Sequence, residues 1–250
     1  MIYVGTSGWQ YRHWRSAFYP AGVPQTRWLE FYAERFATVE SNNAFYRLPE
    51  RHVFESWAAR TPADFRMAVK VSRYLTHILR LREPREPVAR FVDRVRGLGN
   101  KLGPALLQLP PTLEADLPRL TEVLERFPPD IQVAVEFRHA SWFTDETRRV
   151  LERHRAALCL ADRYGPIAPL WRTADWGYAR FHQGRATPRP CYGTGALDTW
   201  AKRLGAMFEP EVPLYAYFNN DHRACAIRNA VEFARACEVA GLGPTRAEEA

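Results

Sequence analysis

The sequence predicts a (β/α)8 TIM barrel that forms a single domain over residues 1–240, followed by a short polar tail over residues 241–250. Three observations favour this fold. Short apolar runs alternate with helix-like segments about eight times, which is typical of parallel strands joined by right-handed crossovers. A chain of 250 residues has room for eight such units. The first turn, GTSGWQYRHW, lacks the G-x-G-x-x-G pattern of an open doubly wound sheet.

Eight apolar runs are the predicted strands, because buried strands are short and several of these runs are rich in Val, Leu, Tyr or Phe. In chain order they are Ile2–Val4, Thr38–Glu40, Arg66–Lys70, Ala105–Gln108, Gln132–Glu136, Ala157–Leu160, Tyr178–Phe181 and Leu214–Phe218. No linker separates them, so no domain boundary is expected.

Apolar side chains at helical spacing predict helices between most of these strands. The segments are Pro24–Phe36, Val88–Leu98, Leu117–Phe127, Thr144–Arg153, Leu197–Phe208 and Ala224–Val239. Thr144 precedes two acidic residues and is the expected N-cap of its helix. Between Asp162 and Tyr178, two prolines and little helical periodicity predict a loop or a short helical turn, so the sixth unit is expected to lack a full helix.

The formal net charge of +7 comes from 32 arginines and only three lysines, Lys70, Lys101 and Lys202. Acidic residues are interspersed and no long run of like charge occurs, which favours a solvated surface over a dedicated nucleic-acid interface. The sequence contains no run of 18 or more apolar residues, so no membrane-spanning helix is predicted. The sequence MIYVGTSGW does not resemble a secretory signal.

The four cysteines, Cys159, Cys191, Cys225 and Cys237, contain no C-x-x-C pair and no zinc-type spacing. We therefore expect a reduced, cytoplasmic protein. Cys159 lies in a predicted strand, and Cys225 and Cys237 lie in the last predicted helix, so all three are expected in the core rather than at a nucleophilic site.

Polar side chains gather at the carboxyl ends of the predicted strands, where TIM barrels carry their chemistry. Strand side chains alternate between the barrel interior and the helical layer. The apolar set of Val133, Val135 and Phe137 should face the helices, which directs Glu136 and Arg138 inward. The same alternation directs a larger polar set inward: Ser7, Glu40, Asn42, Lys70, Gln108, Asp162, Arg180, His182, Asn219 and Asp221.

Charged groups at a barrel mouth are costly to bury unless they are paired or bind a ligand. The expected catalytic residues are Glu136, Glu40, Asp162 and Lys70. The expected substrate-binding residues are Arg138, Arg180, His182, Asn42, Asn219 and Asp221, with Trp9, Tyr46 and Trp142 as aromatic rings that stack on the ligand. The alternative is an ion network that satisfies itself, such as Glu136 with Arg180.

A catalytic metal is the less favoured interpretation, because three cations share the mouth with the carboxylates and no H-x-H or H-E-x-x-H spacing occurs. No cofactor is predicted, although a divalent metal remains the alternative. Glycosidase chemistry is also disfavoured, because three strand spacings place Glu40 and Glu136 about 10 Å apart.

Several motifs occur together and in order: GTSGWQYRHWRSAFYP, TVESNNAFYRLP, TPADFRMAVK, KLGPALLQLPP, AVEFRHASW and YAYFNND. Together they resemble the YecE-like family, also called domain of unknown function 72, over about the first 235 residues. The resemblance implies a TIM barrel and no settled activity. The family's second motif more often reads VEINSTFYRLP, so Ser41, Asn43 and Ala44 depart from it whereas Glu40 and Asn42 match. The family's barrel has been compared with endonuclease-IV-like and xylose-isomerase-like barrels, an analogy of fold alone.

The sequence therefore predicts an enzyme that acts on a phosphorylated or nucleic-acid-like anionic substrate at the carboxyl ends of the strands. A noncatalytic protein that binds an anion or nucleic acid is one alternative. A metal-dependent hydrolase resembling the endonuclease-IV-like barrels is the other. A small phosphorylated ligand is the expected partner, nucleic acid is the alternative partner, and no membrane is expected.

Overall fold

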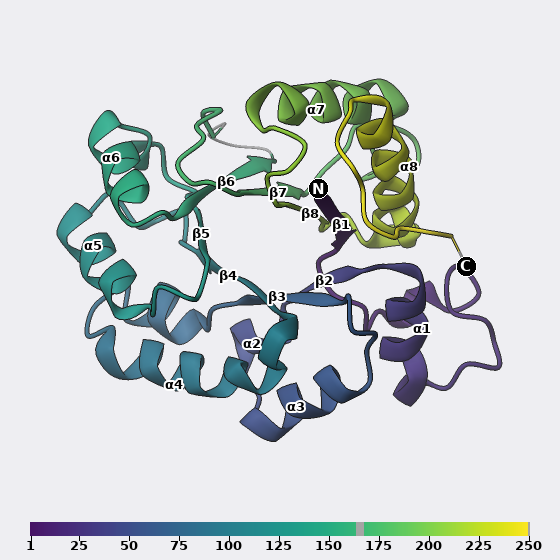
Figure 1. Cartoon of the computed structure of the whole chain (residues 1–250), viewed down its shortest axis with the longest axis horizontal. Helices are drawn as coiled ribbons and strands as arrows, with labels where there is room; N and C mark the ends of the chain where they lie inside the picture. Colours follow the sequence, from purple (N-terminus) through teal and green to yellow (C-terminus); the bar gives the residue numbers. More distant parts are fainter. Residues whose placement is uncertain (164–167, 250) are drawn as a thin grey trace.

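The computed structural model describes residues 1–163 and 168–249, and in it eight parallel strands form a ring surrounded by helices (Figure 1). The strands are β1 (Ile2–Thr6), β2 (Thr38–Ser41), β3 (Arg66–Lys70), β4 (Leu102–Gln108), β5 (Val133–Glu136), β6 (Ala157–Asp162), β7 (Gly177–Phe181) and β8 (Leu214–Phe218). Hydrogen bonding joins them in the order β1-β8-β7-β6-β5-β4-β3-β2. The predicted TIM barrel is confirmed.

The helices that cover the ring include all six predicted segments. They are α1 (Trp28–Arg35), α2 (Asn43–Tyr46), α3 (Arg51–Ala59), α4 (Arg85–Val95), α5 (Leu117–Arg126), α6 (Asp145–Arg153), α7 (Thr194–Met207) and α8 (Cys225–Val239). Thr144 caps α6 as predicted, accepting a hydrogen bond from the Thr147 amide. No helix among the described residues is both long and apolar enough to cross a membrane.

Two units differ in how well the sequence predicted them. Helix α3 was not predicted, although Val53, Phe54, Trp57 and Ala58 lie at helical spacing and pack in or against the core. Between β6 and β7, the residues described on either side of 164–167 form no helix, as expected for the sixth unit. The part of that loop at 164–167 lies outside the described residues.

A side chain, rather than a strand ladder, joins β1 to β2. The Tyr32 hydroxyl accepts a hydrogen bond from the Thr6 amide at 3.0 Å and donates one to the Thr38 carbonyl at 3.1 Å. Gly5 allows this close approach, because a Cβ at that position would lie 2.3 Å from the Thr38 carbonyl oxygen. The barrel is therefore closed at this seam by a buried phenol and a glycine.

The barrel interior is filled by large side chains on one side and small ones on the other. Tyr178 of β7 and Tyr215 and Tyr217 of β8 pack with a set of mostly small residues: Ala68, Leu106, Ala134, Ala157, Cys159 and Ala161. The residues that alternate with them on β5 and β6, such as Val135 and Leu158, belong to the larger core between sheet and helices. Small residues on β6 thus make room for the tyrosines opposite.

The segment predicted as a polar tail packs against the barrel. Residue Ile2 donates to the Gly243 carbonyl and accepts from the Thr245 amide, each at 2.8 Å. The Leu242 side chain is 2% exposed. Arg246 forms an ion pair with Asp64 at 2.8 Å. Residues 241–249 therefore cover the amino-terminal side of β1.

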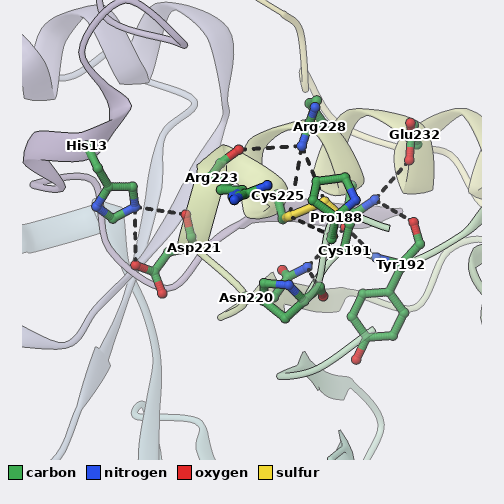
Figure 2. Close-up of a disulfide and its surroundings, with 12 residues drawn as sticks. His13, Pro188, Cys191, Tyr192, Asn220, Asp221, Arg223, Cys225, Arg228 and Glu232 are labelled. Carbon is green, nitrogen blue, oxygen red and sulfur yellow. Dashed lines mark hydrogen bonds and ion pairs between the residues drawn. A yellow bond between two sulfur atoms is a disulfide. The ribbon is translucent and has the colours of Figure 1, made fainter. Parts of the chain in front are cut away.

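The expectation that all cysteines are free is corrected by the disulfide between Cys191 and Cys225 (Figure 2). The two residues are 34 apart in sequence, but the β7–α7 loop and the start of α8 bring their Cα atoms to 5.0 Å. Short cysteine spacings such as C-x-x-C do not reveal this pair, because the fold brings together two cysteines that are distant in sequence. Cys159 and Cys237 are free and buried, as predicted for core residues.

Candidate functional site

A cavity of about 680 Å³ opens at the carboxyl ends of the strands. Its lining draws on the loops after β1, β2 and β3 and on the ends of β4, β5, β7 and β8. The polar and aromatic residues that line it include Trp9, Tyr11, Asn42, Phe45, Tyr46, Lys70, Arg73, His77, Gln108, Arg138, Arg180 and Asn219. Most residues predicted to meet at the mouth therefore do so.

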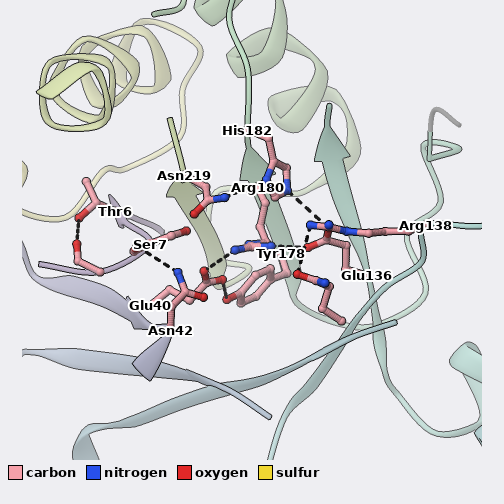
Figure 3. Close-up of polar contacts among 12 residues, drawn as sticks. Thr6, Ser7, Glu40, Asn42, Glu136, Arg138, Tyr178, Arg180, His182 and Asn219 are labelled. Carbon is pink, nitrogen blue, oxygen red and sulfur yellow. Dashed lines mark hydrogen bonds and ion pairs between the residues drawn. The ribbon is translucent and has the colours of Figure 1, made fainter. Parts of the chain in front are cut away.

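Arg180 is the centre of the polar network beneath this cavity (Figure 3). Its Nη1 donates to Glu136 Oε2 at 2.5 Å and its Nη2 donates to Glu40 Oε1 at 2.8 Å. All three side chains are at most 1% exposed. Burial would lower the pKa of Arg180, but Glu40 and Glu136 raise it well above its ordinary value. The arginine therefore stays charged between the two carboxylates.

Glu40 and Glu136 lie on either side of one small planar guanidinium. Their contacting oxygens are therefore closer together than the distance of about 10 Å predicted from three strand spacings. The other oxygen of Glu40 accepts from the Tyr178 hydroxyl at 2.6 Å. The alternative of an internally satisfied ion network thus describes these two carboxylates.

Arg138 is held in place by two neighbours on adjacent strands. The register of β4 and β5 pairs Gln108 with Glu136, which sets both side chains beside Arg138. Arg138 Nε donates to Glu136 Oε1 at 2.9 Å, and its Nη2 donates to Gln108 Oε1 at 3.1 Å. Burial would raise the pKa of Glu136, yet Arg180, His182 and Arg138 hold it well below its ordinary value. Glu136 is therefore an anion that fixes two arginines.

His182 closes the network on the β7 side. Its Nε2 lies 3.5 Å from Glu136 Oε1, and its Nδ1 lies 3.1 Å from the side-chain nitrogen Nδ2 of Asn219. Burial lowers the pKa of His182, although Glu136 opposes the shift. A neutral ring whose Nδ1 accepts from Asn219 agrees with this direction.

Lys70, at the end of β3, is a buried amine in the cavity wall. Its side chain is 8% exposed, and Nζ lies 4.0 Å from the centroid of the Phe45 ring. Burial first, and then the positive charge of Arg180, lower the pKa of Lys70 to about 7.

The first two loops supply a second wall. Asn42 Nδ2 and the Tyr11 hydroxyl both donate to the Ser7 carbonyl, at 3.1 and 2.6 Å. The Ser7 hydroxyl and the side-chain oxygen Oδ1 of Asn42 are buried without a hydrogen-bond partner in the described structure. Such groups gain by accepting or donating to a bound ligand.

The loop after β3 contributes residues that the sequence analysis did not select. A single π-helical turn over Tyr74–Ile78 carries His77 to the cavity, and Arg73 precedes it. Burial lowers the pKa of His77 to about 4, and Lys70, Arg138 and Arg73 contribute to the shift. The Thr76-His77 pair that follows the TPADFRMAVK motif was the available signal, but π-helical turns have no periodicity that identifies them.

The orientation predicted for Asp162 is corrected. Its Oδ2 accepts a hydrogen bond at 2.9 Å from the indole of Trp200, which belongs to α7. The inward positions of β6 are Ala157, Cys159 and Ala161, so Asp162 alternates to the helical side. Both faces of β6 are apolar, so side-chain alternation does not indicate which residues of this strand face inward.

Trp142 is also displaced from the predicted site. It is fully buried, stacks on Phe137 at 4.7 Å and donates to the Leu113 carbonyl at 2.8 Å. The stacking ring expected at the mouth is therefore a core residue beneath the helical layer.

The remaining predicted residues lie at or near the rim. Trp9 lines the cavity although it is largely buried, and Tyr46 lines it with 73% of its surface exposed. Asp221 does not line the cavity. It faces the first loop instead, where its carbonyl accepts from His13 and its carboxylate lies 3.5 Å from the same ring (Figure 2). The indole of Trp14 donates to the same carbonyl at 3.1 Å.

Within residues 1–163 and 168–249, no group of three or more His, Cys, Asp or Glu side chains is arranged to hold a metal ion. The carboxylates predicted as alternative metal ligands are separated by Arg180 or point elsewhere.

Comparison with known proteins identifies relatives over the same region. The model of the family described as "Protein of unknown function DUF72" matches residues 3–249. "UPF0759 protein YecE" of Escherichia coli K12 is 33% identical over 155 residues, which cover 61% of this chain and 54% of that protein. The matched stretch thus spans about half the length of the E. coli relative. "UPF0759 protein YunF" of Bacillus subtilis is 24% identical, and the alignment covers 98% of both chains.

Solved structures show the same fold. A DUF72 family protein from Thermotoga maritima superposes with a TM-score of 0.83 at 28% identity, covering 95% of this chain and 99% of that one. A DUF72 family protein from Enterococcus faecalis gives 0.80 at 19% identity, covering 95% and 96%. The structure named SacUVDE gives 0.55 at 11% identity over 87% of each chain, a likeness of fold alone. Because the family model spans nearly the whole sequence, the chain belongs to the DUF72 family of proteins of unknown function.

Proposed function

We propose that the protein is an enzyme that acts on a small phosphorylated substrate bound in the cavity at the carboxyl ends of the strands. One observation carries this proposal. Among the residues described, the cavity is lined by four basic side chains and by no carboxylate: Lys70, Arg73 and Arg138 in the wall, and Arg180 at its base between the two buried carboxylates. Glu40 and Glu136 lie beneath the wall and are fully buried.

The arrangement favours an anion over a cation. Both buried carboxylates are already occupied by arginine, so they orient the basic groups without presenting negative charge to a ligand. The planar fork of an arginine matches the geometry of a phosphate. Arg138 is fixed by two hydrogen bonds while a quarter of its side chain stays exposed, so its fork is held ready before a ligand binds.

The size of the cavity favours a small molecule. A volume of about 680 Å³ lies within the range of about 300–1,000 Å³ that is typical of small-molecule sites. Trp9, Tyr11 and Tyr46 border the same space and provide apolar surface for the rest of the substrate.

The buried carboxylates act as positioning residues in this proposal. Lys70 is the side chain best placed to react, because it lines the cavity and is not held by either carboxylate. This assignment revises the catalytic roles expected for Glu40 and Glu136.

Calorimetric titration with ribose 5-phosphate and with ribose tests the proposal. We expect the phosphate ester to bind at least tenfold more tightly than the free sugar. Arg138→Gln should lose most of that difference. Arg126→Gln is the matched control and should leave binding unchanged, because Arg126 pairs with Glu122 on the exposed face of α5. Equal affinity for the ester and the sugar would count against a phosphate site.

The affinity for a short single-stranded oligonucleotide, measured over a range of salt concentrations, distinguishes a nucleic-acid ligand from a small phosphorylated one. Binding that spans many phosphates weakens steeply with salt. A single phosphate held in a cavity shows a much shallower dependence.

A further inference from the structure

The Lys70 amine is left unpaired although two carboxylates lie in the same barrel end. Glu40 accepts from Arg180 and Tyr178, and Glu136 accepts from Arg138 and Arg180, so all four carboxylate oxygens are occupied. Across the part of the chain that the structure describes, Lys70 Nζ has no hydrogen bond or ion pair.

The surroundings of Lys70 disfavour its protonated form. Burial removes the amine from water and Arg180 places positive charge near it, and although Glu40 and Glu136 oppose the shift, the pKa of Lys70 falls to about 7. A substantial fraction therefore carries a free lone pair at neutral pH. Desolvation beside other cations is one of the ways in which proteins make a lysine nucleophilic.

We propose that Lys70 forms an imine with the carbonyl carbon of the substrate, which is accordingly an aldehyde or ketone that also carries a phosphate. This inference rests on the proposed function, because the phosphate subsite directs the carbonyl to Lys70. The chain has only three lysines, and Lys70 is the one in the cavity wall.

The reaction balances without an added oxidant or reductant. The amine lone pair forms a C–N bond with the carbonyl carbon, and the C=O π bond breaks so that its electrons move to the oxygen. The nitrogen loses one proton and the oxygen gains one, which gives a hydroxyl group. The resulting carbinolamine loses that hydroxyl as water after gaining a proton from solvent. The nitrogen lone pair then forms the C=N bond of a protonated imine.

The cavity suits both ends of such a substrate. Arg138 and Arg73 line the same wall and provide guanidinium groups for the phosphate. The Phe45 ring, 4.0 Å from Nζ, would lie against the protonated imine and favour its positive charge by a cation–π contact.

Reductive trapping tests the proposal. The full-length protein is incubated at pH 7.5 with glycolaldehyde phosphate and sodium cyanoborohydride, and labelled sites are mapped by peptide mass spectrometry. The candidate amines are Lys70, Lys101, Lys202 and the amino terminus. We expect Lys70 to be labelled at least tenfold faster than the others, and glycolaldehyde without the phosphate to lose this selectivity.

Two variants control the experiment. Lys70→Arg should abolish the selective label, and Lys202→Arg, which changes an exposed side chain of α7, should keep it. Mapping of the unmodified protein decides the question even where Lys70→Arg does not fold. Labelling of Lys70 no faster than Lys202, or equally fast without the phosphate, would overturn the imine.

The two proposals fail in different ways. If ribose 5-phosphate binds more tightly than ribose but no imine is trapped on Lys70, the imine is rejected and the phosphate site stands. If the ester gains no affinity and no adduct forms, both are rejected. Selective trapping that inorganic phosphate suppresses supports both.

Discussion

The carboxylate of Glu136 and the guanidinium of Arg180 form an ion pair of 2.5 Å in which neither side chain is more than 1% exposed. Both charges come from strand ends, so strand alternation fixes their approach. A buried pair of this kind adds little net stability compared with apolar residues of the same volume, because desolvation offsets the attraction. Its effect here is to fix the direction of Arg180 and Arg138 beneath the cavity.

Glu136→Gln should destabilise the protein strongly. The change removes one of two anions around a buried arginine, and breaking such a pair costs about 3–5 kcal/mol. Urea denaturation followed by circular dichroism measures the free energy of unfolding. Glu152→Gln is the matched control, because Glu152 contacts Arg148 at 2.8 Å on the exposed face of α6. A similar loss of unfolding free energy in both variants would show that the burial of Glu136 does not determine the size of the destabilisation.

Acid should weaken the same interaction. The pKa of Glu136 in the folded protein lies well below its ordinary value of 4.5, so the unfolded chain takes up this proton first as the pH falls. The stabilisation is complete above about pH 4.5 and declines below it. Denaturation midpoints measured between pH 6 and pH 3 should fall more steeply for the unmodified protein than for Glu136→Gln. Parallel curves would contradict the assignment.

Lys70→Met should stabilise the fold while removing the reactive amine. Because the pKa of Lys70 is lowered to about 7, the folded protein holds its proton less tightly than the unfolded chain. The cost is largest below pH 7 and disappears as the pH rises toward 10.5, the ordinary value. We expect a gain on the order of a few kcal/mol at pH 6 that shrinks by pH 9.

Lys202→Met serves as the control for this comparison, since Lys202 is exposed on α7. Thermal denaturation of both variants at the two pH values measures the difference. A Lys70→Met protein that is less stable than the unmodified one at pH 6 would show that the amine is well accommodated.

The disulfide predicts a definite thiol count. Protein denatured without reductant should show two reactive thiols per chain, from Cys159 and Cys237, and four after reduction. Closing a loop of this length restricts the unfolded chain, so reduction or Cys191→Ser should lower the free energy of unfolding by about 3–4 kcal/mol. Four reactive thiols before reduction would exclude the bond.

Leu242→Ala tests whether the carboxyl-terminal segment belongs to the folded domain. Leu242 is 2% exposed, and truncating a buried leucine costs about 2–5 kcal/mol. Val239 lies close by but is 89% exposed, so Val239→Ala should change the free energy of unfolding by no more than about 0.5 kcal/mol. Equal effects in the two variants would indicate a loosely attached tail.

Strand alternation was predictable where one face of a strand is clearly apolar. On β5, Val133 and Val135 mark the helical side, and Glu136 follows as an inward residue. On β6 both faces are apolar, because the small inward residues Cys159 and Ala161 make space for tyrosines on β7 and β8. The sequence of β6 alone does not show that its small residues pack against tyrosines from other strands. The predicted inward orientation of Asp162 was wrong for this reason.

The loops were less predictable than the strands. Trp142 and Tyr46 both follow strand ends, yet one is buried against Phe137 and the other is exposed at the rim. The difference depends on how each loop folds back, which no periodicity records. The same holds for Arg73 and His77 on the turn after β3 and for the pairing of Cys191 with Cys225.

The single phenol that joins β1 to β2 has a consequence for how the molecule opens. The other neighbouring strands share backbone ladders, whereas Thr6 and Thr38 meet through Tyr32. Local opening starts where the fewest cooperative bonds must break. Transient parting of the ring should therefore begin between the first two strands, and deuterium should enter the Thr6 amide sooner than the amides of β7.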